Sequence, residues 1–292
     1  MGELVRAASH AGSWYTDDGP SLSKELDKYI AAAGKHPKSA RALIVPHAGY
    51  SYSGPAAAWG YKCVNPDDIA RVFLLGPSHH VFLHKCALSR AGVYRTPLGD
   101  LAIDKTVYSE LRATGQFMDM ELGVDESEHS LEMHLPYIVK TFESRESGMP
   151  PLVPIMVGAL TPAAEAAYGA LLAKYLDDPA NLFIISSDFC HWGKRFDYTP
   201  WDKSAGRLHQ AIEALDRMGM KIIEAKDPDA FTEYIARFKN TICGRHPIGV
   251  FLQTLRQSQS SGLSVAFTRY EQSSACEGYE DSSVSYASAV VF

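Results

Sequence analysis

The chain has 292 residues, of which 46% are hydrophobic and 21% charged, and its formal net charge is −6 at pH 7. A chain of this size and composition can bury a large core without disulfide bonds. The negative charge argues against non-specific binding to nucleic acid or to an anionic membrane surface. No apolar run approaches the roughly 18 residues that a membrane-spanning helix needs, so we expect no membrane insertion.

The cysteines indicate the compartment. There are five of them, and no two form a CxxC pair. An odd number of thiols, without a recognisable signal peptide, fits a reducing compartment better than a disulfide framework. We therefore expect a cytoplasmic protein, or one that is also nuclear.

The first part of the chain alternates between helix and strand patterns. Residues 21–33 have the apolar spacing of a helix. The apolar runs at residues 42–45 and 72–75 predict two buried strands. Asp104 can cap a helix over residues 105–114. Such alternation predicts an α/β fold with parallel strand pairing.

The second part continues the alternation. Residues 130–142 are amphipathic, but Pro136 requires a kink there or a later helix start. The clearest helix, at residues 162–175, lies between apolar strands at 152–157 and 182–185. Two further helices and two closing strands are predicted at residues 205–218, 228–238, 264–270 and 284–291.

The sequence contains no internal repeat, low-complexity tract or flexible linker. Residues 148–151 are the only plausible seam, and we reject them as a boundary because candidate site residues lie on both sides. The prediction is one α/β domain over residues 1–292, with a central, mostly parallel or mixed β-sheet flanked by helices.

Three of the four buried runs lead into turns with ligand-type side chains. His47 follows the first run, His79 and His80 follow the second, and Asp188 and His191 follow the last. Because the carboxyl ends of parallel strands meet at one edge of a sheet, we expect these side chains to share a cleft. The pattern predicts a metal or acid–base site, although a single histidine after a strand is more often structural.

Asp188 and His191 are three residues apart. If the chain turns helical there, both lie on one face and can form a hydrogen bond or share a ligand. A carboxylate beside a histidine fixes its tautomer and raises its basicity. The alternative is an aspartate that caps a helix near an unrelated histidine.

Cys243 lies in a glycine-containing turn, two residues before Arg245. A thiol near a helix start and Arg245 would have a lowered pKa, which favours metal binding or redox chemistry. Taken alone, an inert cysteine is the simpler interpretation. His129 and Glu132 lack HExxH spacing, and they either support the site or belong to a solvated helix start.

Aromatic residues follow the first candidate ligand. Tyr50 and Tyr52 come just after His47, and Trp14 stands in a separate cluster near the start of the chain. Aromatic side chains are most often part of a core. Tyr50 and Tyr52 are nevertheless expected at the rim of the cleft, where a flat side chain can grip a peptide.

Several stretches together resemble the MEMO family, whose members mediate cell motility driven by receptor tyrosine kinases. The stretches are ASHAGSWY (8–15), VPHAGYSYSG (45–54), LLGPSHHV (74–81), DESEHSLEMHLPY (125–137), SSDFCHWG (186–193), NTICGRHPIG (240–249) and EDSSVSYA (280–287). They cover the chain from end to end. The family is similar in fold to LigB-type, class III non-haem iron dioxygenases, which implies a single α/β domain around a central sheet.

The resemblance implies one metal ion held by His47, His79 and Cys243. In the dioxygenases two histidines and a glutamate hold ferrous iron, so a thiolate here replaces the carboxylate. The softer ligand makes copper competitive with iron and leaves zinc open. Asp188 and His191 would then support the ligands or handle protons, and ring cleavage is put in doubt.

The resemblance also implies that a phosphotyrosine-containing receptor tail or adapter peptide binds at the same cleft. The matching positions are Trp14, Tyr52, His47, His79, His191 and Cys243. A second tier of candidate residues comprises His80, His129, Glu132 and Arg245. Further implied partners are cytoskeletal and small-GTPase signalling proteins.

Three functions stay open from the sequence. The first is a metal-binding redox and signalling adapter. The second is a metal-dependent oxidoreductase or dioxygenase that acts on a small aromatic substrate. The third is a metallohydrolase, since clustered histidine and aspartate also suit a metal-activated water. Cys243 favours the first, because the carboxylate suited to ring cleavage is absent.

Overall fold

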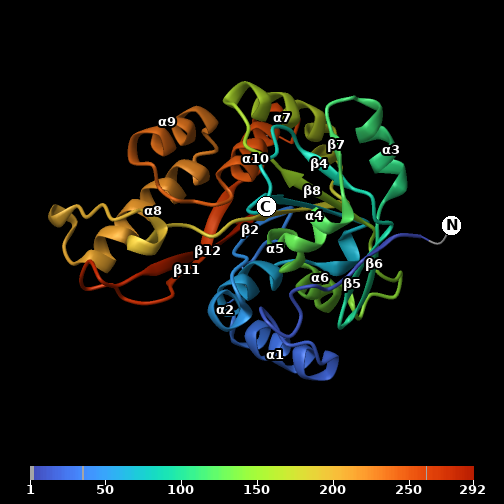
Figure 1. The fold of residues 1–292 in the computed structure, drawn as a ribbon. Coiled ribbons are helices and arrows are strands. Elements are labelled where there is room, and N and C mark those ends of the chain that lie inside the picture. Colours follow the sequence, from blue (N-terminus) through green and yellow to red (C-terminus); the bar gives the residue numbers. More distant parts are fainter. Residues whose placement is uncertain (1–2, 35, 261) are drawn as a thin grey trace.

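A mixed β-sheet forms the centre of the structure, a computed structural model that describes residues 3–34, 36–260 and 262–292 (Figure 1). Nine strands of this part of the chain form the sheet in the order β10-β12-β2-β9-β3-β8-β4-β7, with β11 paired to β12. The four central strands are parallel neighbours. They are β2 (Ala42–Val45), β9 (Asn181–Ser186), β3 (Arg71–Pro77) and β8 (Leu152–Val157).

Every residue of β2, β8 and β9 is buried, which explains why these strands are continuous apolar runs. Antiparallel pairs extend the parallel centre at both sides, β12 on β2 and β4 on β8. The fold prediction is confirmed in its mixed form. The flanking strands are β4 (Ala87–Ser89), β7 (Met118–Met120), β10 (His191–Trp192), β11 (Val265–Gln272) and β12 (Ser283–Val291).

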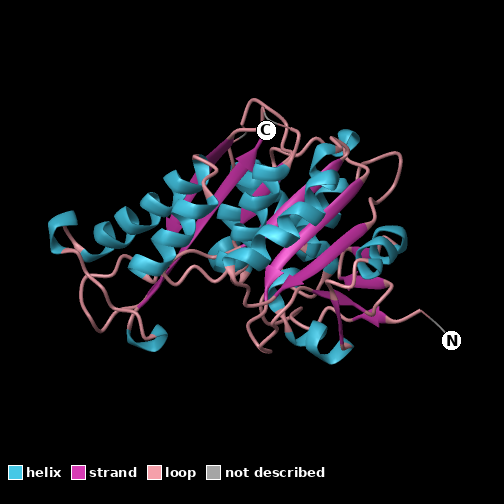
Figure 2. Ribbon diagram, turned by 90° about the horizontal axis from the view of Figure 1, so that it is seen from above, coloured by secondary structure: helices cyan, strands magenta, loops and turns pink. Residues whose placement is uncertain are grey.

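Helices cover both faces of the sheet. On one face lie α7 (Pro162–Asp177) and α10 (Arg245–Gln257), and on the other α1 (Gly19–Ala32) and α2 (Tyr50–Tyr61) (Figure 1). Seen from above, helices cover the strands of the sheet (Figure 2). Since both faces are covered, the only places left for exposed functional side chains on the parallel strands are their ends.

The predicted helices at 105–114 and 228–238 are α3 (Lys105–Ala113) and α9 (Pro228–Phe238). Asp104 caps α3 as expected, because its side chain accepts a hydrogen bond from the Val107 amide. The helix predicted at 205–218 starts later and runs longer, as α8 (Leu208–Glu224). It lies along β11 beside the long β11–β12 hairpin (Figure 1).

The amphipathic stretch at 130–142 is divided, as Pro136 required. It forms α5 (His129–Glu132) and α6 (Leu135–Phe142), with the proline in the first turn of α6. A small second sheet contains β1 (Val5–Arg6), β5 (Val93–Thr96) and β6 (Gly99–Ala102). The remaining elements are α4 (Leu122–Ser127) and the 3-10 helices η1 (Pro66–Asp68), η2 (Lys194–Phe196) and η3 (Lys203–Ala205). Within the described ranges, no helix combines the length and apolar content that crossing a membrane requires.

Candidate metal centre

Loops at the carboxyl edge of the parallel strands bring His47, His79 and Cys243 together. His47 follows β2, His79 follows β3, and Cys243 lies in the turn before α10. One ligand atom from each residue lies within 4.8 Å of the others. His47 Nε2 is 3.1 Å from Cys243 Sγ, and the two imidazole centroids are 5.2 Å apart. These three residues form a group that could hold one metal ion.

A buried carboxylate orients His79. Glu128 Oε1 lies 2.8 Å from His79 Nδ1, and Glu128 Oε2 accepts a hydrogen bond from the His79 amide. Nδ1 is therefore engaged, and Nε2 is left for a ligand. Burial lowers the pKa of His79, but its contacts with Cys243 and Glu128 outweigh burial and raise the pKa to about 10. Burial opposes ionisation of Glu128, but His79 still lowers the pKa of that carboxyl to about 2.

His47 is oriented by a hydroxyl. Its Nδ1 lies 2.6 Å from Ser186 Oγ, so its Nε2 faces Cys243. Burial, together with the surrounding histidines, holds the pKa of His47 well below its ordinary value. The His47 amide donates a 2.8 Å hydrogen bond to Asp188 Oδ1. Asp188 thus shapes the turn that carries His47, and burial raises the pKa of its carboxyl.

The Asp188–His191 pair differs from the helical arrangement that the sequence allowed. The chain after β9 is a loop that leads into β10, so no helix face carries the two residues. His191 Nδ1 instead faces the carbonyl oxygens of Phe189 and Thr241, at 2.9 and 3.1 Å. The side chains of Asp188 and His191 therefore bond to different partners, although both lie beside the cluster.

Cys243 reaches the end of β9 because a glycine follows it. A Cβ on Gly244 would lie 2.4 Å from Ser187 Cβ and 2.5 Å from the Ser186 carbonyl, so only glycine allows this approach. The prediction of a lowered pKa for Cys243 was wrong. Burial raises the pKa of this thiol, although the contact with His79 opposes the rise. Arg245 is not among the groups that shift this pKa, and its exposed side chain contacts His246 at 3.3 Å.

His129 belongs to a stack of rings beside the ligand group. Its imidazole stacks on His79 at a centroid distance of 4.5 Å and on Trp14 at 4.3 Å. Burial lowers the pKa of His129 to about 3, so the ring is neutral. His79, Glu128 and His129 form a second set of close ligand-type atoms. His80 is exposed, with its centroid 6.1 Å from that of His129.

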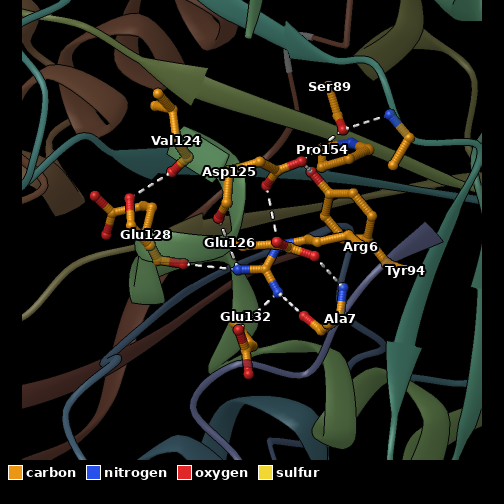
Figure 3. A network of polar contacts seen from close by, with 12 residues as sticks. Arg6, Ala7, Ser89, Tyr94, Val124, Asp125, Glu126, Glu128, Glu132 and Pro154 are labelled. Atoms are coloured by element: carbon orange, nitrogen blue, oxygen red, sulfur yellow. Dashed lines mark hydrogen bonds and ion pairs between the residues drawn. The ribbon is translucent and has the colours of Figure 1, made fainter. Parts of the chain in front are cut away.

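Glu132 lies in a buried ionic network rather than in the cleft. Its carboxylate accepts hydrogen bonds from Arg6 Nη1 at 2.6 Å and from the Tyr15 hydroxyl at 2.8 Å, and it also contacts His10. Arg6 further binds Asp125 and the backbone carbonyl of Glu128 (Figure 3). This network joins the first strand to the segment that carries Glu128.

A groove of about 550 Å³ opens beside the cluster. Trp14, Tyr52 and Arg195 lie on its wall, together with several serines. Tyr52 is 60% exposed and Trp14 is 37% exposed. Tyr50, which was expected at the rim, is only 2% exposed, and its hydroxyl donates to the Met133 carbonyl. The rim prediction was thus wrong for Tyr50, because the first turn of α2 directs it into the core.

Sequence reasoning missed Glu128, Ser186 and His134 as partners of the cluster. Ser186 is the last residue of an apolar strand, and that position was its only signal. Glu128 lies in the stretch 125–137, which carries part of the family resemblance, but nothing in the neighbouring sequence indicates that it bonds to His79. His134 is buried, and its Nε2 lies 2.8 Å from Ser186 Oγ.

Comparison with known proteins gives the family. The profile described as Memo-like protein matches residues 6–290. Protein MEMO1 from Xenopus tropicalis is 53% identical and that from Homo sapiens 51%, each match covering 99% of this chain and 97% of the relative. Protein memo-1 homolog from Caenorhabditis elegans is 46% identical, over 100% of this chain and 84% of its own.

Among solved structures, an uncharacterized protein from Escherichia coli K12 has a TM-score of 0.46 and 10% identity, over 84% of this chain and 98% of its own. The profile and the curated relatives cover nearly the whole chain and agree with each other. The chain therefore belongs to the Memo-like protein family.

Proposed function

We propose that this protein binds one iron or copper ion through His47, His79 and Cys243 and serves as an intracellular redox and signalling protein. The observation that carries the proposal is the 3.1 Å approach of His47 Nε2 to Cys243 Sγ, with His79 alongside. The other nitrogen of each imidazole already has a hydrogen-bond partner. Metal-binding histidines almost always have such a partner, which fixes the ring and its tautomer.

The donor set fits a soft or borderline metal. Two imidazoles and one thiolate suit copper and iron, and zinc also accepts them. Iron or copper would supply redox chemistry when bound. The chain's own residues orient the donors: Glu128 holds His79, Ser186 holds His47, and the Asp188 amide donates a 3.2 Å hydrogen bond to Cys243 Sγ.

A dioxygenase acting on a small aromatic substrate is the second candidate, and one observation favours it. The neighbouring set His79, Glu128 and His129 has the composition of a two-histidine, one-carboxylate site. The carboxylate, however, already accepts hydrogen bonds from the amides of His79 and Ser130 and lies against His79 Nδ1. Glu128 is therefore better suited to orienting His79 than to binding a metal, and the redox and signalling function is preferred.

We further propose that the groove binds a phosphotyrosine-containing peptide and so relays signals from receptor tyrosine kinases to the cytoskeleton. Trp14 and Tyr52 offer flat faces for an aromatic side chain, and Arg195 offers positive charge for a phosphate. Trp14 also stacks on His129, which stacks on His79. A peptide that displaces Trp14 would therefore disturb the packing of His129 against the ligand His79.

The metal proposal is tested by elemental analysis of protein purified without added metal, followed by titration of the stripped protein with ferrous iron or with copper(I). Wild type should bind one equivalent, and His79→Ala should bind much more weakly. His80→Ala is the matched control, because the adjacent His80 is exposed and lies outside the ligand group. Equal loss of metal in both variants, or no loss in His79→Ala, would refute the assignment.

The peptide proposal is tested by fluorescence anisotropy with a phosphotyrosine peptide and its unphosphorylated form. Trp14→Ala should weaken binding of the phosphorylated peptide about tenfold or more, since a central tryptophan usually dominates such a contact. Phe82→Ala is the control, because this aromatic side chain is 80% exposed and is not part of the groove wall. Equal affinity of Trp14→Ala and wild type would refute peptide binding in this groove.

A further inference from the structure

A chain of buried hydrogen bonds runs from His47 into the core, away from the cleft. Ser186 Oγ lies 2.6 Å from His47 Nδ1, 2.8 Å from His134 Nε2 and 2.7 Å from the carbonyl oxygen of Ser130. His134 Nδ1 in turn lies 2.9 Å from the Tyr61 hydroxyl. All four side chains in this chain of contacts are buried. One hydroxyl therefore serves three neighbours.

The proton count at Ser186 allows one solution. A serine hydroxyl has one proton to donate and two lone pairs to accept with. The Ser130 carbonyl can only accept, so Ser186 must donate its proton there. Both imidazoles must then donate to Ser186 Oγ, His47 from Nδ1 and His134 from Nε2.

At the other end of this hydrogen-bond network, His134 and Tyr61 also have matching donors and acceptors. Burial lowers the pKa of His134 to about 3, so its ring is neutral and carries a single N–H. With that proton on Nε2, Nδ1 has a free lone pair, and the Tyr61 hydroxyl can donate to it. Every donor from Tyr61 to His47 then has an acceptor, and no buried polar atom of the four side chains is left unpaired.

We propose that Ser186, His134 and Tyr61 are positioning residues that hold His47 as the tautomer with its proton on Nδ1. The lone pair on Nε2 then faces Cys243 Sγ, 3.1 Å away. In the metal-free protein this lone pair can accept a hydrogen bond from the Cys243 thiol, which keeps its proton. It is also the lone pair that a metal ion in the cleft requires. The role of this tautomer in metal binding rests on the proposed function, whereas the tautomer itself follows from the hydrogen bonds alone.

Nitrogen NMR of metal-free protein labelled with ¹⁵N-histidine tests the tautomer directly. Long-range proton–nitrogen correlations distinguish a protonated ring nitrogen from an unprotonated one. The expected spectrum has His47 protonated at Nδ1 and His134 protonated at Nε2, with His47→Gln and His134→Gln used to assign the signals. A His47 ring protonated at Nε2 in the wild-type protein would overturn the proposal.

Substitutions test whether the chain of contacts sets this state. Ser186→Ala removes the shared acceptor, so His47 should become a mixture of tautomers and metal affinity should fall by about 10- to 100-fold. Ser288→Ala is the matched control, since Ser288 is also buried and donates to a carbonyl, that of Ala56, at 2.6 Å. Tyr61→Phe is a milder variant in case Ser186→Ala fails to fold, and it should disturb the His134 tautomer. A single unchanged His47 tautomer in Ser186→Ala would contradict the inference.

The two proposals fail in different ways. If the protein has the Nδ1–H tautomer at His47 but binds no metal, the metal site is refuted and the hydrogen-bonded chain stands. If metal binds tightly while His47 is protonated at Nε2 in the metal-free state, the proposed hydrogen-bond network is refuted and the metal site stands.

Discussion

The Arg6→Met substitution tests how the first strand holds the segment beside the candidate metal centre. The Arg6 guanidinium is fully buried and is the central donor of the network in Figure 3. It bonds to Asp125 Oδ1 at 3.0 Å and to Glu132 Oε2 at 2.6 Å. It also donates to the backbone carbonyls of Asp125 and Glu128, each at 2.8 Å.

The magnitude follows from what the substitution leaves behind. The carboxylates of Asp125 and Glu132 have no exposed side-chain surface, and both lose the guanidinium that pairs with them, because methionine can donate to neither. Removing one partner of a buried ion pair costs about 3–5 kcal/mol. Asp125 keeps donors from Ser89 and Tyr94, and Glu132 keeps Tyr15. We therefore expect a total loss of about 3–5 kcal/mol rather than the sum of two broken pairs.

Urea unfolding followed by tryptophan fluorescence measures the loss. Arg90→Met is the control, because Arg90 pairs with Glu121 at the surface, where the side chains are 47% and 68% exposed. That variant should lose less than about 1 kcal/mol. If Arg6→Met also lost less than about 1 kcal/mol, the network would not anchor the segment that carries Glu128.

Three further predictions concern pH and packing. Burial raises the pKa of Asp216 from its ordinary 3.8 to about 6, so its contribution to stability is present below about pH 4 and is lost as pH rises through 6. The loss is about 3 kcal/mol, and unfolding at several pH values should show it in wild type and not in Asp216→Asn. Metal binding must displace protons from His79, with its pKa near 10, and from Cys243, so affinity should rise with pH; a flat profile in competition titrations would contradict this. Gly244→Ala should weaken metal binding, because its Cβ would lie 2.4 Å from the nearest side-chain carbon, whereas Gly278→Ala, with nothing within 4 Å, should not.

The main strands could be predicted because each is buried on both faces. Strands such as β2 and β9 contain only apolar residues apart from their ends, and their length separates them from helices. Helix α2 was missed because Gly54, Pro55 and Gly60 interrupt its pattern. The short strand β10 carries no periodic signal, and only its pairing with β12 defines it.

The candidate ligands could be predicted only in part from local sequence. His47 and His79 follow strands that are parallel and share an edge, so topology alone brings them together. Glu128 and Ser186 could not be predicted as their partners, because they lie 49 and 139 residues away along the chain. The wrong pKa prediction at Cys243 had the same origin, since burial by distant segments raises this pKa and Arg245 contacts His246 instead.

The central claim is that two imidazoles and one thiolate bind the same ion, and X-ray absorption spectroscopy of protein loaded with one equivalent of copper(I) tests it most directly. The spectrum should show one sulfur and two imidazole nitrogens around the metal, and the sulfur signal should vanish in Cys243→Ser. A first shell of nitrogen and oxygen only in the wild-type protein, or an unchanged spectrum in Cys243→Ser, would contradict the account.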